Sequence, residues 1–189
     1  MMSSFEDLQH QYFAEREAER TRKAELARRQ ASEAKELQAR YQKISTVAGH
    51  VATTLLQRNV SLAVEIYRQS IVRPAKLWRS EVVDTEVLAQ GWVVNDEIGS
   101  VTTGSGLTEA QTTTHNIVLL SDKGEFVKSY CEGPGVSPRI LVDSGNNDSR
   151  VYTPLDSVDV LNKNRLDIPR LEGLIVAFAS ERDISLQGF

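Results

Sequence analysis

The pattern of hydrophobic and polar positions divides the chain into two stretches of different character. From Ala14 to Arg40 the residues are mostly Ala, Glu, Arg, Lys, Gln and Leu, which lose little side-chain freedom in a helix. Residues 1–46 contain no Gly and no Pro, whereas all 11 glycines and 5 prolines follow them. The pattern therefore predicts one long N-terminal helix.

An apolar seam becomes denser toward the end of this helix, with steps of three and four residues from Ala34 to Leu55. A stripe about three heptads long is typical of a coiled coil. A lone helix would leave it exposed, so we expect it to be covered by the chain's own C-terminal part or in an oligomer. Upstream the stripe thins to alanines, and that part is expected to be exposed until it meets a partner. The residues expected to bind a partner are Leu37, Tyr41, Ile44, Val51 and Leu55.

The end of the helix is open to two interpretations. Gly49 interrupts the seam, and a Gly inside a helix costs about 1 kcal/mol relative to Ala. It marks either a close helix–helix approach or the end of a first helix, with a second helix then running to about Gln69. The competing prediction is a short strand at 60–67, where apolar residues alternate. We favour the helix and divide the chain into a helical stalk, 1–70, and a second domain, 71–189.

The second domain shows the alternation of apolar and polar residues that is typical of strands, followed by the pattern of one amphipathic helix. Gly124 ends the turn at 121–124 and supplies the positive φ that a tight hairpin needs. A tract at 99–114, rich in Gly, Ser and Thr, predicts a loop or the beginning of a strand. The predicted strands cover 76–83, 87–94, 116–120, 125–130, 139–143 and 150–155, the last four forming two hairpins.

The C-terminal helix has clear signals for its beginning. Asp167 can cap it and Pro169 fits its first turn, and the apolar residues that follow lie on one side. Such a helix would cover one face of an antiparallel sheet. The predicted fold class is α+β: a long helical, coiled-coil-like segment, then a small and mostly antiparallel sheet domain closed by a C-terminal helix.

Composition restricts the compartment more than the function. Apolar residues make up 40% and charged residues 25% of the 189 residues, as in ordinary globular chains. Cys131 is the single cysteine, so no intrachain disulfide can form, and a reducing cytoplasm is expected. The N-terminus has no secretory pattern, and no apolar run approaches the roughly 20 residues that span a bilayer. We therefore expect no membrane partner.

His115 and Cys131 are the one nucleophile–base combination in the sequence. His115 precedes the first strand of the predicted hairpin and Cys131 follows the second, so both lie at its open end. An imidazole within hydrogen-bond reach could draw the proton from the thiol. A lone Cys is more often a small buried hydrophobe. The three histidines lie far apart and no Cys/His cluster occurs, so we expect no metal site and no cofactor.

The segment Arg58–Arg79 carries five basic residues against one acidic residue, with Tyr67 and Trp78 among them. Basic residues interleaved with aromatic ones can bind phosphates and stack on bases. The net charge of −4 argues against general nucleic-acid binding. The candidates for contact with an anionic partner are Arg68, Arg73, Lys76 and Arg79.

These patterns favour a cytoplasmic, non-enzymatic interaction or assembly protein. The N-terminal helix would self-associate or bind another protein, and the α+β domain would carry recognition. The alternatives are a small enzyme with its site near His115 and Cys131, or a protein that binds nucleic acid or another anion through Arg58–Arg79.

Overall fold

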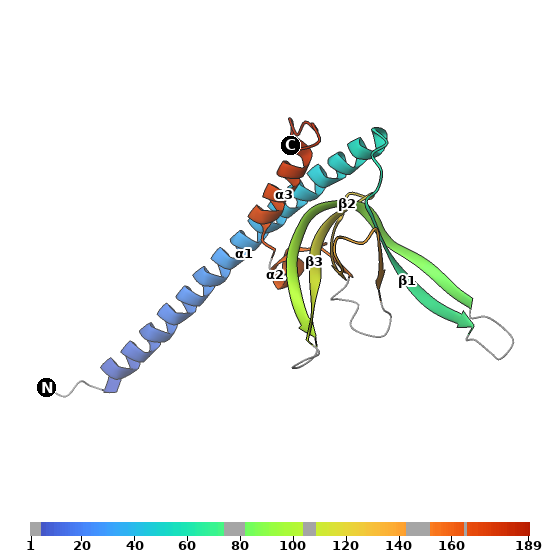
Figure 1. The fold of residues 1–189 in the computed structure, drawn as a ribbon. Helices are drawn as coiled ribbons and strands as arrows, with labels where there is room; N and C mark the ends of the chain where they lie inside the picture. The colour runs from blue at the N-terminus through green and yellow to red at the C-terminus, as the bar shows by residue number, and fades with distance from the viewer. Residues whose placement is uncertain (1–4, 74–81, 104–108, 143–151, 165) are drawn as a thin grey trace. The chain divides into compact units, whose positions relative to one another are not determined.

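One helix of 53 residues, α1 (Phe5–Gln57), forms the first part of the molecule (Figure 1). At 1.5 Å per residue it is about 80 Å long. The prediction of a long N-terminal helix is confirmed, and Gly49 does not interrupt it. The chain divides into two compact units, residues 1–40 and 41–189. The computed structural model describes residues 5–73, 82–103, 109–142, 152–164 and 166–189.

Asn59 explains why α1 ends at Gln57. Its backbone has φ of 54°, the left-handed conformation that Asn tolerates better than most residues. The amide of Asn59 bonds to the carbonyl of Leu56, and the amide of Val60 bonds to the carbonyl of Leu55, both at 3.0 Å. These two bonds form a Schellman motif that closes the helix. The favoured prediction of helix to about Gln69 was therefore wrong.

A six-stranded mixed sheet follows, in the order β5-β1-β2-β3-β4-β6. The β1–β5 pair is parallel, and the other four pairs are antiparallel. The fold is thus α+β, as predicted. The strands are β1 (Val64–Arg73), β2 (Val82–Thr103), β3 (Ala110–Ser121), β4 (Phe126–Glu132), β5 (Arg139–Val142) and β6 (Tyr152–Pro154). The strand alternative for 60–67 is therefore the correct one from Val64 onward.

Strand β2 is 22 residues long and changes partner at Gly91. Residues before Gly91 pair with β1 and residues after it pair with β3, while Gly91 itself lies opposite both Val64 and Ser121. A Cβ atom on Gly91 would lie 2.0 Å from the carbonyl oxygen of Leu120, so only glycine fits there. Of the predicted loop 99–114, residues 99–103 belong to β2 and 110–114 to β3; residues 104–108 lie outside the described residues.

One predicted hairpin is confirmed and the other is wrong. Strands β3 and β4 pair from Leu120–Phe126 outward, and Gly124 has φ of 80° in their turn. The segments 139–143 and 150–155 do not pair with each other. Instead β5 pairs with β1 and β6 pairs with β4, on opposite edges of the sheet. The reason is burial, since Ile140 and Val142 join a core formed with β1. Residues 76–81 and 143–151, which carry the other predicted strand and turn, are outside the described residues.

Three helical segments and one face of the sheet form the first core of the unit 41–189. Apolar residues come from α1 after Arg40, from α2 (Val158–Lys163) and from α3 (Ile168–Ser180). The predicted cap of α3 is confirmed, because the carboxylate of Asp167 accepts a hydrogen bond from the amide of Arg170 at 2.8 Å. Large side chains of this core include Leu55, Trp92, Leu120, Phe126, Leu155, Leu161, Leu171, Ile175 and Phe178.

A second core lies on the opposite face of the sheet. Along β3, Val118 and Leu120 belong to the first core while Ile117 and Leu119 belong to the second. Successive side chains of a strand point to opposite faces, so β3 is buried on both. The second core also holds Cys131 and residues from β1, β2, β4 and β5. Two buried faces explain the nearly continuous apolar run at 117–120.

Gly49 lies where α1 meets the β3–β4 turn. A Cβ atom on Gly124 would lie 2.5 Å from the Cα atom of Gly49, whereas a Cβ atom on Gly49 itself would meet nothing within 4 Å. The hairpin turn therefore packs directly on the backbone of α1. The close approach at this position is between a helix and a hairpin turn, not between two helices. The contact requires glycine at position 124 and not at position 49.

Candidate functional site

The seam residues predicted to bind a partner divide into two groups. Ile44, Val51 and Leu55 are at most 3% exposed and belong to the first core of the unit 41–189. Leu37 is 37% exposed. Tyr41 is half-buried and packs against the same core. The dense part of the seam is thus covered by the chain's own sheet domain, the first of the two coverings that the sequence allowed.

Tyr41 also makes a polar contact inside this unit. Its hydroxyl donates a hydrogen bond of 2.6 Å to the carbonyl oxygen of Leu155. Burial, and then the carboxylates of Asp156 and Glu125, raise the pKa of the Tyr41 phenol above its ordinary value of 10.0. The phenol is therefore held in its neutral, donating form well into the alkaline range.

The described arginines of the basic segment belong to two different parts of the chain, the turn at the end of α1 and strand β1. Arg58 donates from its guanidinium to the carbonyls of Arg182 and Asp183, at 2.7 and 3.1 Å, and so fixes the C-terminal tail. Arg68 and Arg73 both lie on β1. Of these two, Arg68 is half-buried. The other two candidates, Lys76 and Arg79, lie outside the described residues.

His115 and Cys131 come together as predicted, and a third residue joins them. The two lie directly opposite each other on β3 and β4, a position in which Cβ atoms are about 5 Å apart. Nδ1 of His115 lies 3.0 and 2.9 Å from the two carboxylate oxygens of Asp96 on β2. A carboxylate only accepts hydrogen bonds, so Nδ1 carries a proton and donates to Asp96.

This arrangement leaves the other nitrogen of the ring with no partner. Nε2 of His115 is buried and has no hydrogen-bond partner within the described part of the chain. Only 3% of His115 and 8% of Cys131 are exposed. A carboxylate, an imidazole and a thiol on three adjacent strands have the composition of an activated nucleophile. No hydrogen bond joins the ring to the thiol, however, and burial of both restricts access by a substrate.

The sequence did not indicate Asp96 as a site residue, because the segment that pairs with its strand was predicted to be a loop. With 99–114 taken as a loop, no strand pairing connected Asp96 to His115. In the structure, β2 and β3 stay paired from Gly91–Ser121 to Thr103–Ala110, which brings residues 19 apart in sequence to hydrogen-bond distance. The run of three threonines at 112–114 was the available signal, since Thr favours strands.

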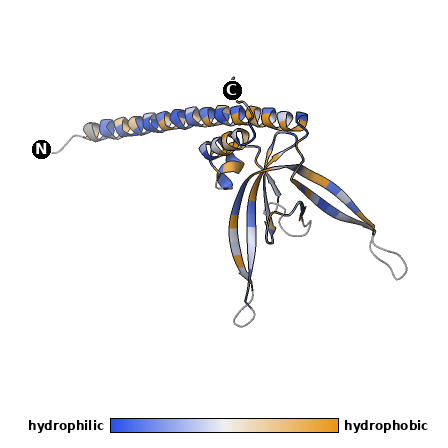
Figure 2. Cartoon of the chain, turned by 45° about the horizontal axis from the view of Figure 1, so that its top comes forward, coloured by the Kyte–Doolittle hydropathy of each residue, from blue (hydrophilic) through white to orange (hydrophobic). Residues whose placement is uncertain are grey.

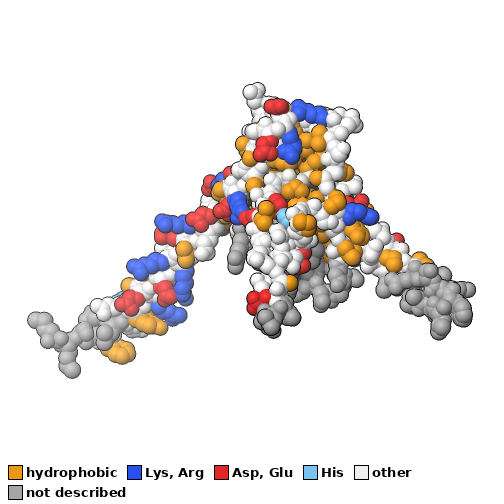
Figure 3. Space-filling model, viewed as in Figure 1, with side chains coloured by type: hydrophobic (Ala, Val, Ile, Leu, Met, Phe, Trp, Pro, Cys, Tyr) orange, Lys and Arg blue, Asp and Glu red, His pale blue; other side chains and the backbone are white. Residues whose placement is uncertain are grey.

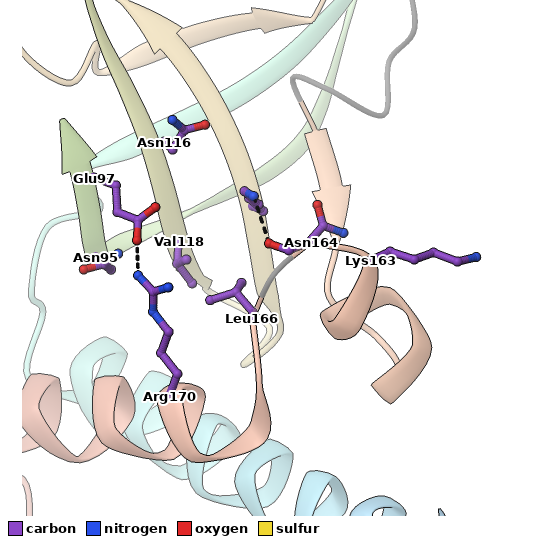
Figure 4. Close-up of a pocket in the computed structure, with 9 residues that line it drawn as sticks. Asn95, Glu97, Asn116, Val118, Lys163, Asn164, Leu166 and Arg170 are labelled. Atoms are coloured by element: carbon purple, nitrogen blue, oxygen red, sulfur yellow. Dashed lines mark hydrogen bonds and ion pairs between the residues drawn. The ribbon is translucent and has the colours of Figure 1, made fainter. Parts of the chain in front are cut away.

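A polar cleft of about 400 Å³ opens on the other side of the sheet (Figure 4). Strands β2, β3 and β4 form one wall, and the end of α2, the beginning of α3 and residues between them form the other. Three asparagine side chains, Asn95, Asn116 and Asn164, line it together with Lys128 and Arg170. Amides both donate and accept, so the cleft has the groups to hold a small polar ligand or a peptide backbone.

Two of the cations at the cleft are held by neighbouring groups, and only one of them by an opposite charge. Arg170 forms an ion pair with Glu97, and Nζ of Lys128 donates to the backbone carbonyl of Asn164 at 3.2 Å. Lys163 points away from the other residues of the cleft in Figure 4. Sequence reasoning missed this site because its residues come from six separate segments at no shared spacing.

Comparison with family models, with curated proteins and with solved structures finds no match to this chain. Among the described residues, no group of three His, Cys, Asp or Glu side chains is placed to hold a metal ion. Within the same residues, no helix has a stretch both long and apolar enough to cross a bilayer. A proposal for its function is therefore argued from the geometry of the chain itself.

Proposed function

We propose that this protein is a non-enzymatic interaction protein that binds a helical partner through residues 5–40 of α1. The observation that carries the proposal is exposure. Every side chain described from Gln9 to Ala39 is exposed, along a helical segment about 46 Å long. Charged side chains cover this segment in Figure 3, and hydrophilic residues dominate it in Figure 2.

An exposed helix of this length needs a reason to persist. Most helices in proteins gain their stability from packing of an apolar face, not from intrinsic propensity. Pairs such as Glu19–Lys23, at 2.6 Å, add only about 0.2–0.5 kcal/mol each. A partner that covers one face would supply the missing packing, since burying one large apolar side chain contributes roughly 1.5–3 kcal/mol.

An apolar stripe along this segment supports the proposal. Tyr12 and Leu26 are 56% and 57% exposed, and Leu37 follows on the same side. Their spacings of 14 and 11 residues are close to four and three turns of helix, so the three side chains share one face. The partner surface thus begins at Leu37 and extends toward the N-terminus, while Ile44, Val51 and Leu55 anchor the helix in the unit 41–189.

The unit 41–189 is proposed to carry recognition, with the cleft between the sheet and the α2–α3 connection as its surface. Asn95 and Asn116 offer amide groups there, while the side-chain nitrogen of Asn164 already donates to the carbonyl of Val160 at 2.9 Å. Such groups distinguish partners by hydrogen-bond pattern more than by charge. The helix would supply assembly and the cleft would supply selectivity.

Site-specific photocrosslinking of the full chain in its native cells tests the proposal. A photoreactive amino acid would replace Leu26 or Leu37 on the stripe. Matched control positions are Glu17 and Lys35, which lie nine residues, or two and a half turns, from Leu26 on the opposite face. We expect one crosslinked protein species from the stripe positions and little from the controls. Absence of crosslinks at both stripe positions would refute the proposal.

The contact between Asp96 and His115 favours a second candidate, a thiol-dependent enzyme. An imidazole held by a carboxylate has a fixed orientation, and Cys131 lies opposite it. The test is the rate at which iodoacetamide alkylates Cys131 in the native full chain, compared with His115→Gln. This candidate requires rapid alkylation near neutral pH and slower alkylation in the variant. An inert thiol in both proteins excludes it.

A further inference from the structure

The exposed segment of α1 is divided into halves of opposite charge. Residues 5–20 carry five acidic and two basic residues, a formal charge of −3. Residues 21–40 carry six basic and three acidic residues, a formal charge of +3. The segment as a whole is neutral, so this asymmetry does not appear in its net charge.

The apolar stripe crosses both halves. Phe5 and Tyr12 lie in the acidic half, and Leu26 and Leu37 lie in the basic half. All four are exposed, Phe5 most of all. Adjacent members are separated by 7, 14 and 11 residues, so each follows the last by nearly a whole number of turns. Any helix that covers this stripe therefore lies along both charged halves.

We propose that residues 5–40 pair with the same segment of a second copy of the chain, in antiparallel orientation. This inference rests on the proposed function and names its partner. In a two-fold antiparallel pair, the acidic half of each helix lies along the basic half of the other, and the same contact occurs twice. In a parallel pair, like charges would face each other along the entire length.

Charge complementarity sets orientation more strongly than it sets affinity. The flanking charges of a two-stranded coiled coil determine which helices pair and in which direction. Here the complement of each half is present in the same segment, so no second sequence is needed. With full overlap the two-fold axis passes between residues 22 and 23, and Leu26 of both copies lies within about 6 Å of it along the helix.

The stripe is sparse, and the pair should therefore be weak and sensitive to salt. Four apolar side chains per copy must offset the loss of translational and rotational freedom. Attraction between exposed charges falls once the Debye length drops to about 3 Å at 1 M salt. The dimer should form at low ionic strength and dissociate on dilution or on addition of salt.

Light scattering of the full chain over a range of concentrations is the first test. We expect the mass to approach that of a dimer at low salt and of a monomer at 1 M salt. A monomer at every concentration and salt would overturn the inference. If photocrosslinking from Leu26 still yields a different protein, the proposed function survives without it; if neither experiment shows an interaction, both fail.

Fluorescence energy transfer determines the orientation. Full chains carrying Cys131→Ala receive one dye at Gln9→Cys or at Gln38→Cys. In the antiparallel pair, positions 9 and 38 of different copies lie side by side, whereas two copies of position 9 are about 40 Å apart along the axis. With a dye pair whose Förster radius is well below this separation, we expect efficient transfer from 9 to 38 and weak transfer from 9 to 9. The reverse result would overturn the inference.

Charge reversal tests whether the opposite charges of the two halves cause the pairing. Combining Arg22→Glu, Arg28→Glu and Arg29→Glu makes the second half −3, and we expect this variant to associate about tenfold more weakly or worse. The matched control replaces the same three residues with Lys. Combining Glu15→Lys, Glu17→Lys and Glu19→Lys in another chain makes its first half +3. An equimolar mixture of the two reversed chains should recover dimers, which also shows that both still fold; no recovery would overturn the inference.

Discussion

The two parts of α1 have the same stripe and opposite environments. Before Arg40 the stripe is exposed at Tyr12, Leu26 and Leu37, whereas after it Ile44 and Leu55 are buried in the first core. The helix itself is continuous through both parts. The difference shows that periodicity identifies the face that will be covered, while the density of apolar residues determines whether the chain itself covers it.

Density separates the two parts clearly. From Tyr41 onward an apolar residue recurs every three or four positions, so each turn of helix contributes to the core. Before Arg40 the exposed members recur every 7 to 14 residues, with charged residues between them. A face of that composition cannot bury enough apolar area to join a core, but it can pair with a helix of matching charge.

The largest effect is expected from a comparison of one substitution in each part of the helix. We expect Leu55→Ala to lower the free energy of unfolding of the unit 41–189 by about 2–5 kcal/mol, because a fully buried Leu leaves a cavity. Leu26→Ala should change it by less than about 0.5 kcal/mol, because its side chain lies at the surface. Urea unfolding measures both. Similar losses in the two variants would show that the two parts of the helix are not distinct.

The contact between the hairpin turn and α1 can be broken at Gly124. In Gly124→Ala, the new Cβ atom would clash with Gly49, and alanine would be held at positive φ. A non-glycine residue in that backbone region costs about 1–3 kcal/mol, and the clash adds to it. Gly135→Ala is the matched control, since a Cβ atom there meets nothing within 4 Å. Urea unfolding should show a loss at Gly124 alone, and an unaffected Gly124→Ala would refute the contact.

At Gly49, on the other side of that contact, we expect a substitution to raise the free energy of unfolding instead of lowering it. Gly49→Ala places a methyl group in open space inside a helix, so it should raise the free energy of unfolding by about 1 kcal/mol. Ala31→Gly, in the exposed part of α1, should lower the total helix signal in circular dichroism and leave the free energy of unfolding of the unit 41–189 unchanged. A destabilised Gly49→Ala would mean that the helix needs glycine at this position.

The smallest expected effect concerns Tyr41, the first residue of the buried part. Burial raises the pKa of its phenol above 10.0 in the folded state, so folding favours the protonated form. The corresponding stability is fully present below pH 10 and is lost as pH rises through the folded-state pKa. The free energy of unfolding should fall above pH 10, and less steeply in Tyr41→Phe. Tyr152, whose pKa is also raised chiefly by burial, keeps part of the slope. Equal slopes in both proteins would contradict this assignment.

Signals that act within a few residues were sufficient for much of the fold. Composition predicted α1, a positive-φ glycine predicted the turn at Gly124, and Asp167 with Pro169 predicted the start of α3. The end of α1 also depends on a local residue, Asn59. This signal is weaker, because Asn adopts the left-handed conformation in only some of its occurrences.

What the sequence by itself determined is therefore the long helix α1 with the face that it buries after Arg40, the β3–β4 turn and the start of α3. Only the tertiary structure decided which surfaces meet. It covered Ile44, Val51 and Leu55 with the chain's own sheet, paired β5 with β1 instead of with β6, and brought Asp96 to His115. The reason is physical: helix caps, turns and periodicity depend on neighbours along the chain, whereas strand partners and core contacts depend on residues far apart in sequence, whose competing pairings a single pattern does not distinguish.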